Sequence, residues 1–153
     1  MPRSPGDPAP EIGARTQDGE TVSPDFAEPT VVYFYPRDDT RGCTIEATEF
    51  EAELDAYREA GVAVYGVSTD DVDSHAAFAE KHDLSFDLLA DPEGAVASAF
   101  GLELREGPGD PAAPRTTFVL ADGEVKRVYE AVDPEGHAEE VLTDVREADL
   151  ATE

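Results

Sequence analysis

Apolar and polar residues follow two periods along this chain, one typical of strands and one typical of helices. Residues 30–35 (Thr-Val-Val-Tyr-Phe-Tyr) are a short β-branched and aromatic run of the kind that forms a buried strand. In residues 43–60 the apolar side chains instead recur three or four positions apart, which places them on one face of a helix. The pattern therefore predicts a strand that turns directly into a helix, and Gly61 is expected to end that helix.

The remainder of the chain continues as alternating strands and helices. Further strands are expected at 62–67, 86–89, 117–120 and 125–129, and further helices at 74–82, from Asp91-Pro92 to Gly101, and from the N-cap Asp133 with Pro134 onward. Asp122-Gly123 and the early Asp18-Gly19 are hairpin signals. This order predicts an α/β protein of thioredoxin-like architecture, with a mixed central sheet flanked by helices and an N-terminal β-hairpin extension. The order of the strands in the sheet is not readable from the pattern.

The only cysteine, Cys43, lies where the first predicted strand turns into the first helix. Unpaired backbone N–H groups and the helix dipole favour a negative charge there, and the thiolate is the reactive form of cysteine. Pro36 stops the strand, and Gly42 removes side-chain bulk so that a small molecule can approach the sulfur. The Thr40 hydroxyl can hydrogen-bond the sulfur or an incoming oxygen, or simply cap the helix. The position suits a nucleophile.

An inert role is the alternative for Cys43. Free cysteines are among the most buried residues, and Cys43 lies in register with the apolar stripe of its own helix. Stripe position alone favours the inert role, whereas the Pro-x-x-x-Thr-x-x-Cys spacing at a strand-to-helix turn favours the nucleophile.

Pro36, Thr40 and Cys43 match the signature of peroxiredoxins, the cysteine-dependent peroxidases on a thioredoxin fold. The longer stretch 33–44 resembles the Q-type branch, also called bacterioferritin comigratory proteins. The resemblance continues through residues 6–10, 67–70, 88–92 and 115–120, together with Ser74, His75, Phe78 and Lys81. It therefore covers nearly the whole chain in the expected order.

The resemblance implies a role for each matching residue. Cys43 would be the peroxidatic cysteine, which attacks the O–O bond of a peroxide and becomes a sulfenic acid. Thr40 would hydrogen-bond the peroxide and the sulfur, and Pro36 would shield the pocket that Gly42 also shapes. Arg115 would correspond to the arginine that stabilises the thiolate and orients the peroxide. No metal and no cofactor are implied.

The charge of the chain independently indicates that a cation is needed near the thiolate. A net charge of −25 disfavours a new anion, so a nearby guanidinium would have to offset it. Arg37 and Arg41 are local candidates, while Arg115 heads a predicted apolar strand, where strand-end residues often line sites. A surface arginine or an ordinary ion pair is the alternative for Arg115.

A missing cysteine changes the expected mechanism. Many Q-type members carry a second cysteine five residues after the first, where this chain has Thr48, and there is no other cysteine to form an intramolecular disulfide. The sulfenic acid would then be reduced by an external thiol, either a thioredoxin-like protein or a small thiol, or by Cys43 of another subunit. The Pro- and Gly-rich segment 106–114, which leads into Arg115, either borders the active-site mouth or is a trimmed surface connection.

Composition bounds the setting of the protein. At 153 residues we expect one domain, residues 1–153, and the excess of 36 acidic over 11 basic residues, with only Lys81 and Lys126 as lysines, is typical of a halophile. The acidic surface argues against nucleic-acid or anionic-membrane binding. With no signal peptide or membrane segment visible and one reduced cysteine, we expect a cytoplasmic protein, monomeric or homodimeric.

Two classes of function remain. The first is a peroxidase that uses Cys43, Thr40 and Arg115 on hydrogen peroxide or small alkyl hydroperoxides. The second is a noncatalytic redox sensor or binding module, in which Cys43 is oxidised once and signals to a partner. A metal site involving His75 and His82 lacks a third close ligand in the sequence.

Overall fold

The computed structural model of the chain describes residues 3–36, 38, 40–104, 113–130 and 132–147. The strands are β1 (Ala14–Thr16), β2 (Thr21–Val22), β3 (Thr30–Phe34), β4 (Ala63–Ser68), β5 (Asp87–Ala90), β6 (Thr116–Ala121) and β7 (Glu124–Tyr129). The helices are α1 (Arg41–Ala52), α2 (Leu54–Glu59), α3 (Val72–His82), α4 (Ala95–Ala99) and α5 (His137–Glu147). Every strand that the sequence predicts is present, with its ends shifted by no more than a residue or so.

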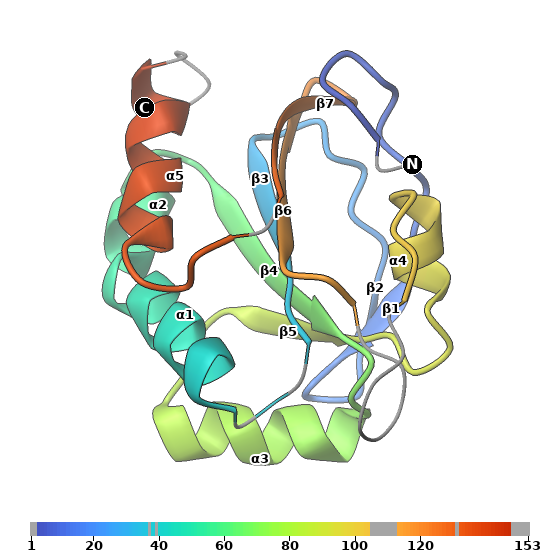
Figure 1. The fold of residues 1–153 in the computed structure, drawn as a ribbon, viewed down its shortest axis with the longest axis vertical. Coiled ribbons are helices and arrows are strands. Elements are labelled where there is room, and N and C mark those ends of the chain that lie inside the picture. The colour runs from blue at the N-terminus through green and yellow to red at the C-terminus, as the bar shows by residue number, and fades with distance from the viewer. Residues whose placement is uncertain (1–2, 37, 39, 105–112, 131, 148–153) are drawn as a thin grey trace.

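The strands form one mixed sheet in the order β2-β1-β5-β4-β3-β6-β7 (Figure 1). β3, β4 and β5 run parallel, whereas β6 pairs antiparallel with β3, and β7 antiparallel with β6. The predicted N-terminal hairpin is confirmed as β1 and β2, and β1 extends the sheet by pairing antiparallel with β5. The fold is therefore the mixed, thioredoxin-like sheet that the sequence predicts.

Both faces of the sheet are covered, because side chains alternate along the buried central strands. On β3, Val31 and Tyr33 point into a core built with α1, α2, α3 and α5, while Val32 and Phe34 point into a second core built with α4. Figure 1 shows α1, α2 and α5 on one side of the sheet and α4 on the other. None of the helices in the described part of the chain is long and apolar enough to span a membrane.

The helix predicted over residues 43–60 is two helices. α1 ends at Ala52 and α2 begins at Leu54, with Glu53 between them at φ −94° and ψ 0°. The prediction is wrong at this point because Phe50, Leu54 and Tyr57 all remain buried across the break. Apolar spacing therefore continues through a residue at which the backbone departs from the helix.

The predicted starts of the last two helices are also wrong. α4 begins at Ala95 rather than at Asp91-Pro92, because Gly94 adopts a left-handed backbone at φ +76° and ends the preceding turn. The carboxylate of Asp91 still stabilises the helix start, since it accepts hydrogen bonds from the Val96 and Ala97 amides at 2.9 Å each. α5 begins at His137 rather than beside Asp133, whose carboxylate accepts from the Glu135 amide in a local turn instead.

Candidate active site

The sheet brings the start of α1 and the start of β6 to the same edge. β3 runs into the segment that precedes α1, and the antiparallel register pairs Phe34 at the end of β3 with Thr116 at the start of β6. Arg115, one residue before Thr116, therefore lies beside the end of β3. This is how two residues 72 positions apart in the sequence, Cys43 and Arg115, come into contact.

The sulfur of Cys43 lies in the first turn of α1 and is 1% exposed. The sulfur is surrounded by apolar core residues, as the inert role predicts. It also has a charged partner, because Nη2 of Arg115 donates a hydrogen bond to Sγ at 3.4 Å. A guanidinium beside a sulfur at a helix start stabilises the thiolate. The arrangement can thus hold a reactive anion in a largely apolar enclosure.

Thr40 is the N-cap residue of α1, and its exposed side chain lies one turn before the sulfur-bearing residue. Its backbone is extended, at φ −88° and ψ 159°, and its carbonyl accepts from the Thr44 amide at 2.8 Å. The side chain makes no capping hydrogen bond, so the simple helix-cap role considered for the hydroxyl is wrong. A direct role toward a peroxide stays a prediction.

Glu46 is the residue of the site that sequence reasoning missed. It lies three residues after Cys43 on the same face of α1, and its carboxylate accepts from Nη1 of Arg115 at 2.8 Å. The side chain is 0% exposed, and its second oxygen, Oε2, has no hydrogen-bond partner among the described residues. The sequence did hold a signal for Glu46, since its carboxyl group falls on the apolar face of the helix. A carboxylate buried there needs a cation beside it, which predicts a buried ion pair.

The charges of this cluster influence one another. Burial raises the pKa of Glu46 to about 7, against the opposing effect of the Arg115 cation. Burial lowers the pKa of Arg115, but the charges of Cys43 and Glu46 outweigh this and leave the pKa raised. Burial also lowers the pKa of His137, and Arg115 acts in the same direction, although Glu140 opposes both. Arg115 therefore supplies positive charge at the sulfur.

Gly42 lies directly beside the guanidinium of Arg115. A Cβ atom at Gly42 would lie 3.0 Å from Nη2 of Arg115, a tighter approach than side-chain carbons normally make. The space that the missing side chain leaves is therefore space that the guanidinium uses to reach the sulfur, and the predicted approach of a small molecule beside Gly42 stays a prediction.

The other predicted residues contribute less to the geometry. Arg41 is exposed on α1, and Arg37 lies outside the described residues. Pro36 is half-buried directly after Tyr35, and its shielding role stays a prediction. Most of the segment 106–114 also lies outside the described residues. Thr48, where a second cysteine was looked for, is exposed, and its hydroxyl donates to the Thr44 and Ile45 carbonyls within α1.

A single buried cysteine held by an arginine at a helix start, on a thioredoxin-like sheet, defines a thiol-based redox protein. The family model described as the AhpC/TSA family matches residues 5–128 of the chain. Peroxiredoxin Bcp of Escherichia coli (strain K12) is 36% identical over 152 residues, which cover 95% of this chain and 97% of that protein.

Solved structures agree with the sequence comparison. Xanthomonas campestris peroxiredoxin Q superposes with a TM-score of 0.81 at 32% identity, covering 89% of this chain and 90% of that one. The bacterioferritin comigratory protein of X. campestris, solved to explain its alkyl peroxide reduction activity, gives a TM-score of 0.82 at 31% identity over 90% of this chain and 91% of that one. The chain belongs to the AhpC/TSA family, as a peroxiredoxin of the Q or Bcp branch, and is a thiol-dependent peroxidase.

Proposed function

We propose that Cys43 is the peroxidatic cysteine of a one-cysteine catalytic cycle, with Arg115 and Thr40 as its catalytic partners. One observation carries the proposal: the guanidinium of Arg115 donates a hydrogen bond at 3.4 Å to the sulfur of the only cysteine in the chain. A buried, unactivated cysteine would have no need of this cation.

The first half of the cycle oxidises the sulfur. The Cys43 thiolate attacks the terminal oxygen of the hydroperoxide, so that an S–O bond forms, the O–O bond breaks, and the alcohol or water leaves with a proton. Negative charge develops on both oxygens as the bond breaks. The Nη2 group of Arg115 and the hydroxyl of Thr40 are suited to stabilise that charge, because donors that are already in place need no reorganisation during the reaction.

The second half of the cycle restores the thiol. An external thiol attacks the sulfenic sulfur and releases water to form a mixed disulfide, and a second thiol attacks that disulfide to free Cys43. The proposal assigns the reduction to an external thiol because the chain holds no second cysteine. A thioredoxin-like protein and a small thiol such as a tripeptide are both suitable reductants. Hydrogen peroxide and small alkyl hydroperoxides are the proposed substrates, in line with the alkyl peroxide activity of the X. campestris relative.

The proposal extends to the cellular location, salt adaptation and assembly of the enzyme. We place it in the cytoplasm of a halophile, as a monomer or homodimer made of a single domain. The support is the reduced state that a lone catalytic thiol requires, together with a net charge of −25 and the fact that all strands of the described residues join one sheet.

The test is steady-state and rapid-mixing kinetics with hydrogen peroxide and an excess of a reducing thiol, in concentrated salt. Wild-type protein should consume many peroxides per subunit. Cys43→Ser should consume none while keeping its circular dichroism, and Arg115→Lys should slow the oxidation of Cys43 by about a hundredfold. Arg127→Lys is the matched control, because Arg127 is 45% exposed and its only described ion pair is with Asp144.

Each outcome separates the two classes of function. Turnover that survives in Cys43→Ser would overturn the assignment of the nucleophile. A single oxidation of the wild-type protein that an added thiol does not reverse would support the redox sensor instead.

A further inference from the structure

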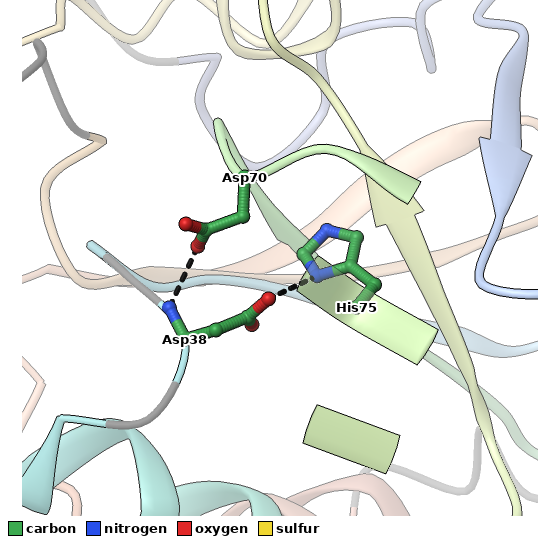
Figure 2. Close-up of side chains that lie close together, drawn as sticks. All are labelled: Asp38, Asp70 and His75. Carbon is green, nitrogen blue, oxygen red and sulfur yellow. Dashed lines mark hydrogen bonds and ion pairs between the residues drawn. The ribbon is translucent and has the colours of Figure 1, made fainter. Parts of the chain in front are cut away.

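A second buried polar cluster lies next to the active site and is not used by the cycle above. Its members are Asp38, Asp70 and His75 (Figure 2). Asp38 follows β3 and Asp70 follows β4, at the edge where these parallel strands both end, while His75 is on the first turns of α3. The side chain of His75 is 0% exposed and that of Asp38 is 4% exposed.

The hydrogen bonds of His75 require an additional proton. Nε2 lies 3.0 Å from the Leu89 carbonyl oxygen, which only accepts, so Nε2 carries a hydrogen. Nδ1 lies 2.7 Å from Oδ2 of Asp38, which is also an acceptor when ionised. A neutral imidazole has one N–H group and can satisfy one of these contacts. Both contacts are hydrogen bonds only when the His75–Asp38 pair holds one further proton.

The same three residue types also occur in metal sites, but here the candidate ligand atoms already have protein partners. Oδ1 of Asp38 accepts from the Tyr35 hydroxyl at 2.6 Å, and Oδ2 accepts from the Ser74 hydroxyl at 2.8 Å as well as facing His75. Oδ2 of Asp70 accepts from the Ser68 hydroxyl at 2.7 Å and from the backbone amide of Asp38 at 2.6 Å. The cation that this cluster accommodates is therefore a proton, and the protein groups complete its hydrogen bonding.

Asp38 connects this cluster to the segment that carries the candidate active site. Asp38 lies between β3 and α1, two residues before Thr40 and five before Cys43. Its backbone amide is bound by Asp70, and its carboxylate is bound by side chains from the end of β3 and from α3. The segment that leads into the catalytic turn is thus tied to α3 and to the end of β4 through this residue.

We propose that Asp38 and His75 are positioning residues for the peroxidase reaction, and that the proton they share holds the segment before α1 in the geometry that brings Thr40 and Cys43 to the peroxide. This inference rests on the proposed function. The two residues act through Thr40 and Cys43, because neither the carboxylate nor the imidazole contacts the sulfur.

The groups that face the His75 ring are Asp38, Asp70 and Tyr35, together with the Leu89 carbonyl of β5. Burial and the charge of Asp38 raise the pKa of Tyr35 well above its usual value, so its hydroxyl stays protonated and donates to Asp38. A substitution that removes one of the two hydrogen bonds of His75 leaves the segment before α1 held less firmly, so the oxidation of Cys43 slows.

The experiment follows the rate of Cys43 oxidation by hydrogen peroxide at one fixed pH, beside the rate of Cys43 alkylation by an uncharged haloacetamide. Alkylation needs a reachable thiolate but no oriented peroxide. Asp38→Ala should slow oxidation at least tenfold while changing alkylation much less. Asp38→Asn is the conservative rescue, because its amide N–H donates to Nδ1 of a neutral His75. It should react near the wild-type rate. Asp73→Asn, at an exposed position of α3, should match wild type.

Any of four results would overturn the inference. Oxidation of Asp38→Ala at the wild-type rate, or an Asp38→Asn protein as slow as Asp38→Ala, would show that the pair does not position the site. Oxidation and alkylation that fall equally in Asp38→Ala would show a general structural role. A wild-type protein that reacts no faster than a free thiol would instead remove the proposed function, and with it the role of the pair.

Discussion

Glu46 is enclosed in the core one helical turn after Cys43, and its carboxylate accepts from Nη1 of Arg115 while Nη2 donates to the sulfur. A guanidinium with a partner at each terminal nitrogen has little freedom to turn away. The cost of this arrangement is a buried carboxyl group with one oxygen, Oε2, unpaired. The structure thus accepts a loss of stability at Glu46 to orient Arg115.

Replacing Glu46 by glutamine should make the protein more stable at alkaline pH and slower as an enzyme. The pKa of Glu46 is raised from 4.5 to about 7, so between these values the folded state binds a proton that the unfolded state has released. Wild-type stability therefore falls by about 3 kcal/mol as pH rises through this window, a decline that Glu46→Gln lacks. Urea unfolding at a series of pH values measures the difference between the two proteins.

Glu59→Gln is the matched control for that experiment, because Glu59 is exposed on α2 and its charge is not buried on folding. It should follow the wild-type curve. A stability difference between Glu46→Gln and wild type that is the same at every pH would contradict a near-neutral titration of Glu46.

Sequence reasoning found the residues of the site that carry a recognisable chemical pattern, and missed those that only support them. Cys43 and Arg115 were both identified, and the structure brings them together. Glu46 and Asp38 were not, because a carboxyl group in sequence does not reveal which charge or ring will face it. That information arises when β3, β6 and α3 meet at one edge of the sheet.

The first turn of α1 depends on a close approach between backbone and guanidinium. Gly42→Ala would place a Cβ atom 3.0 Å from Nη2 of Arg115, so the guanidinium has to move a few tenths of an ångström away. Because alanine also favours the helix over glycine, stability should change by no more than about 1 kcal/mol. Oxidation of Cys43 should nevertheless slow about tenfold, since small misplacements at a reacting centre are costly.

Rapid-mixing kinetics measures the oxidation rate of the Gly42→Ala protein, and thermal unfolding measures its stability. Thr48→Ala, on the exposed face of the same helix, is the control and should leave the oxidation rate unchanged. A Gly42→Ala protein that reacts as fast as wild type would show that the guanidinium does not depend on this space.

At the level of elements, periodicity located the helices better than it located their ends. The apolar faces of α1, α2 and α5 are buried as predicted, including Ala138, Val141, Leu142 and Val145 on α5. Their ends depend on single residues: Glu53 divides one predicted helix, and Gly94 delays the start of another. Such residues change one backbone angle without disturbing the apolar stripe, so the pattern does not register them.

The whole molecule carries a net charge of −25, and its stability should depend strongly on salt. Repulsion among exposed carboxylates acts over a Debye length of about 10 Å at 0.1 M salt and about 3 Å at 1 M. Raising potassium chloride across this range should raise the midpoint of thermal unfolding and sharpen the transition. A midpoint that is the same at both concentrations would contradict the proposed halophilic adaptation.

Strand order was the property of the whole molecule that the sequence did not reveal. Alternation along a strand shows which side chains are buried, but β3 and its neighbours β4 and β6 are separated by long stretches of chain. Which strands pair depends on how the whole sheet packs against its helices, and a pattern within one strand contains no information about that packing. The order of strands and helices along the chain thus predicted the thioredoxin-like architecture but left the strand order open.

The near-complete burial of Cys43, at 1% exposure, means that the two half-reactions place opposite demands on the same helix turn. Hydrogen peroxide is small enough to reach an enclosed sulfur, whereas a thiol carried by another protein cannot contact it while the first turn of α1 is closed as it is in this structure. The lifetime of the oxidised enzyme is then governed by how often that turn opens. During this interval a further peroxide competes for the sulfur and drives it to sulfinic acid, which is not readily reversed. The chain has no second thiol to react with the sulfenic acid. The fraction of enzyme that is reduced back to the thiol, rather than oxidised irreversibly, therefore depends on the rate of helix opening relative to the rate of reaction with a further peroxide.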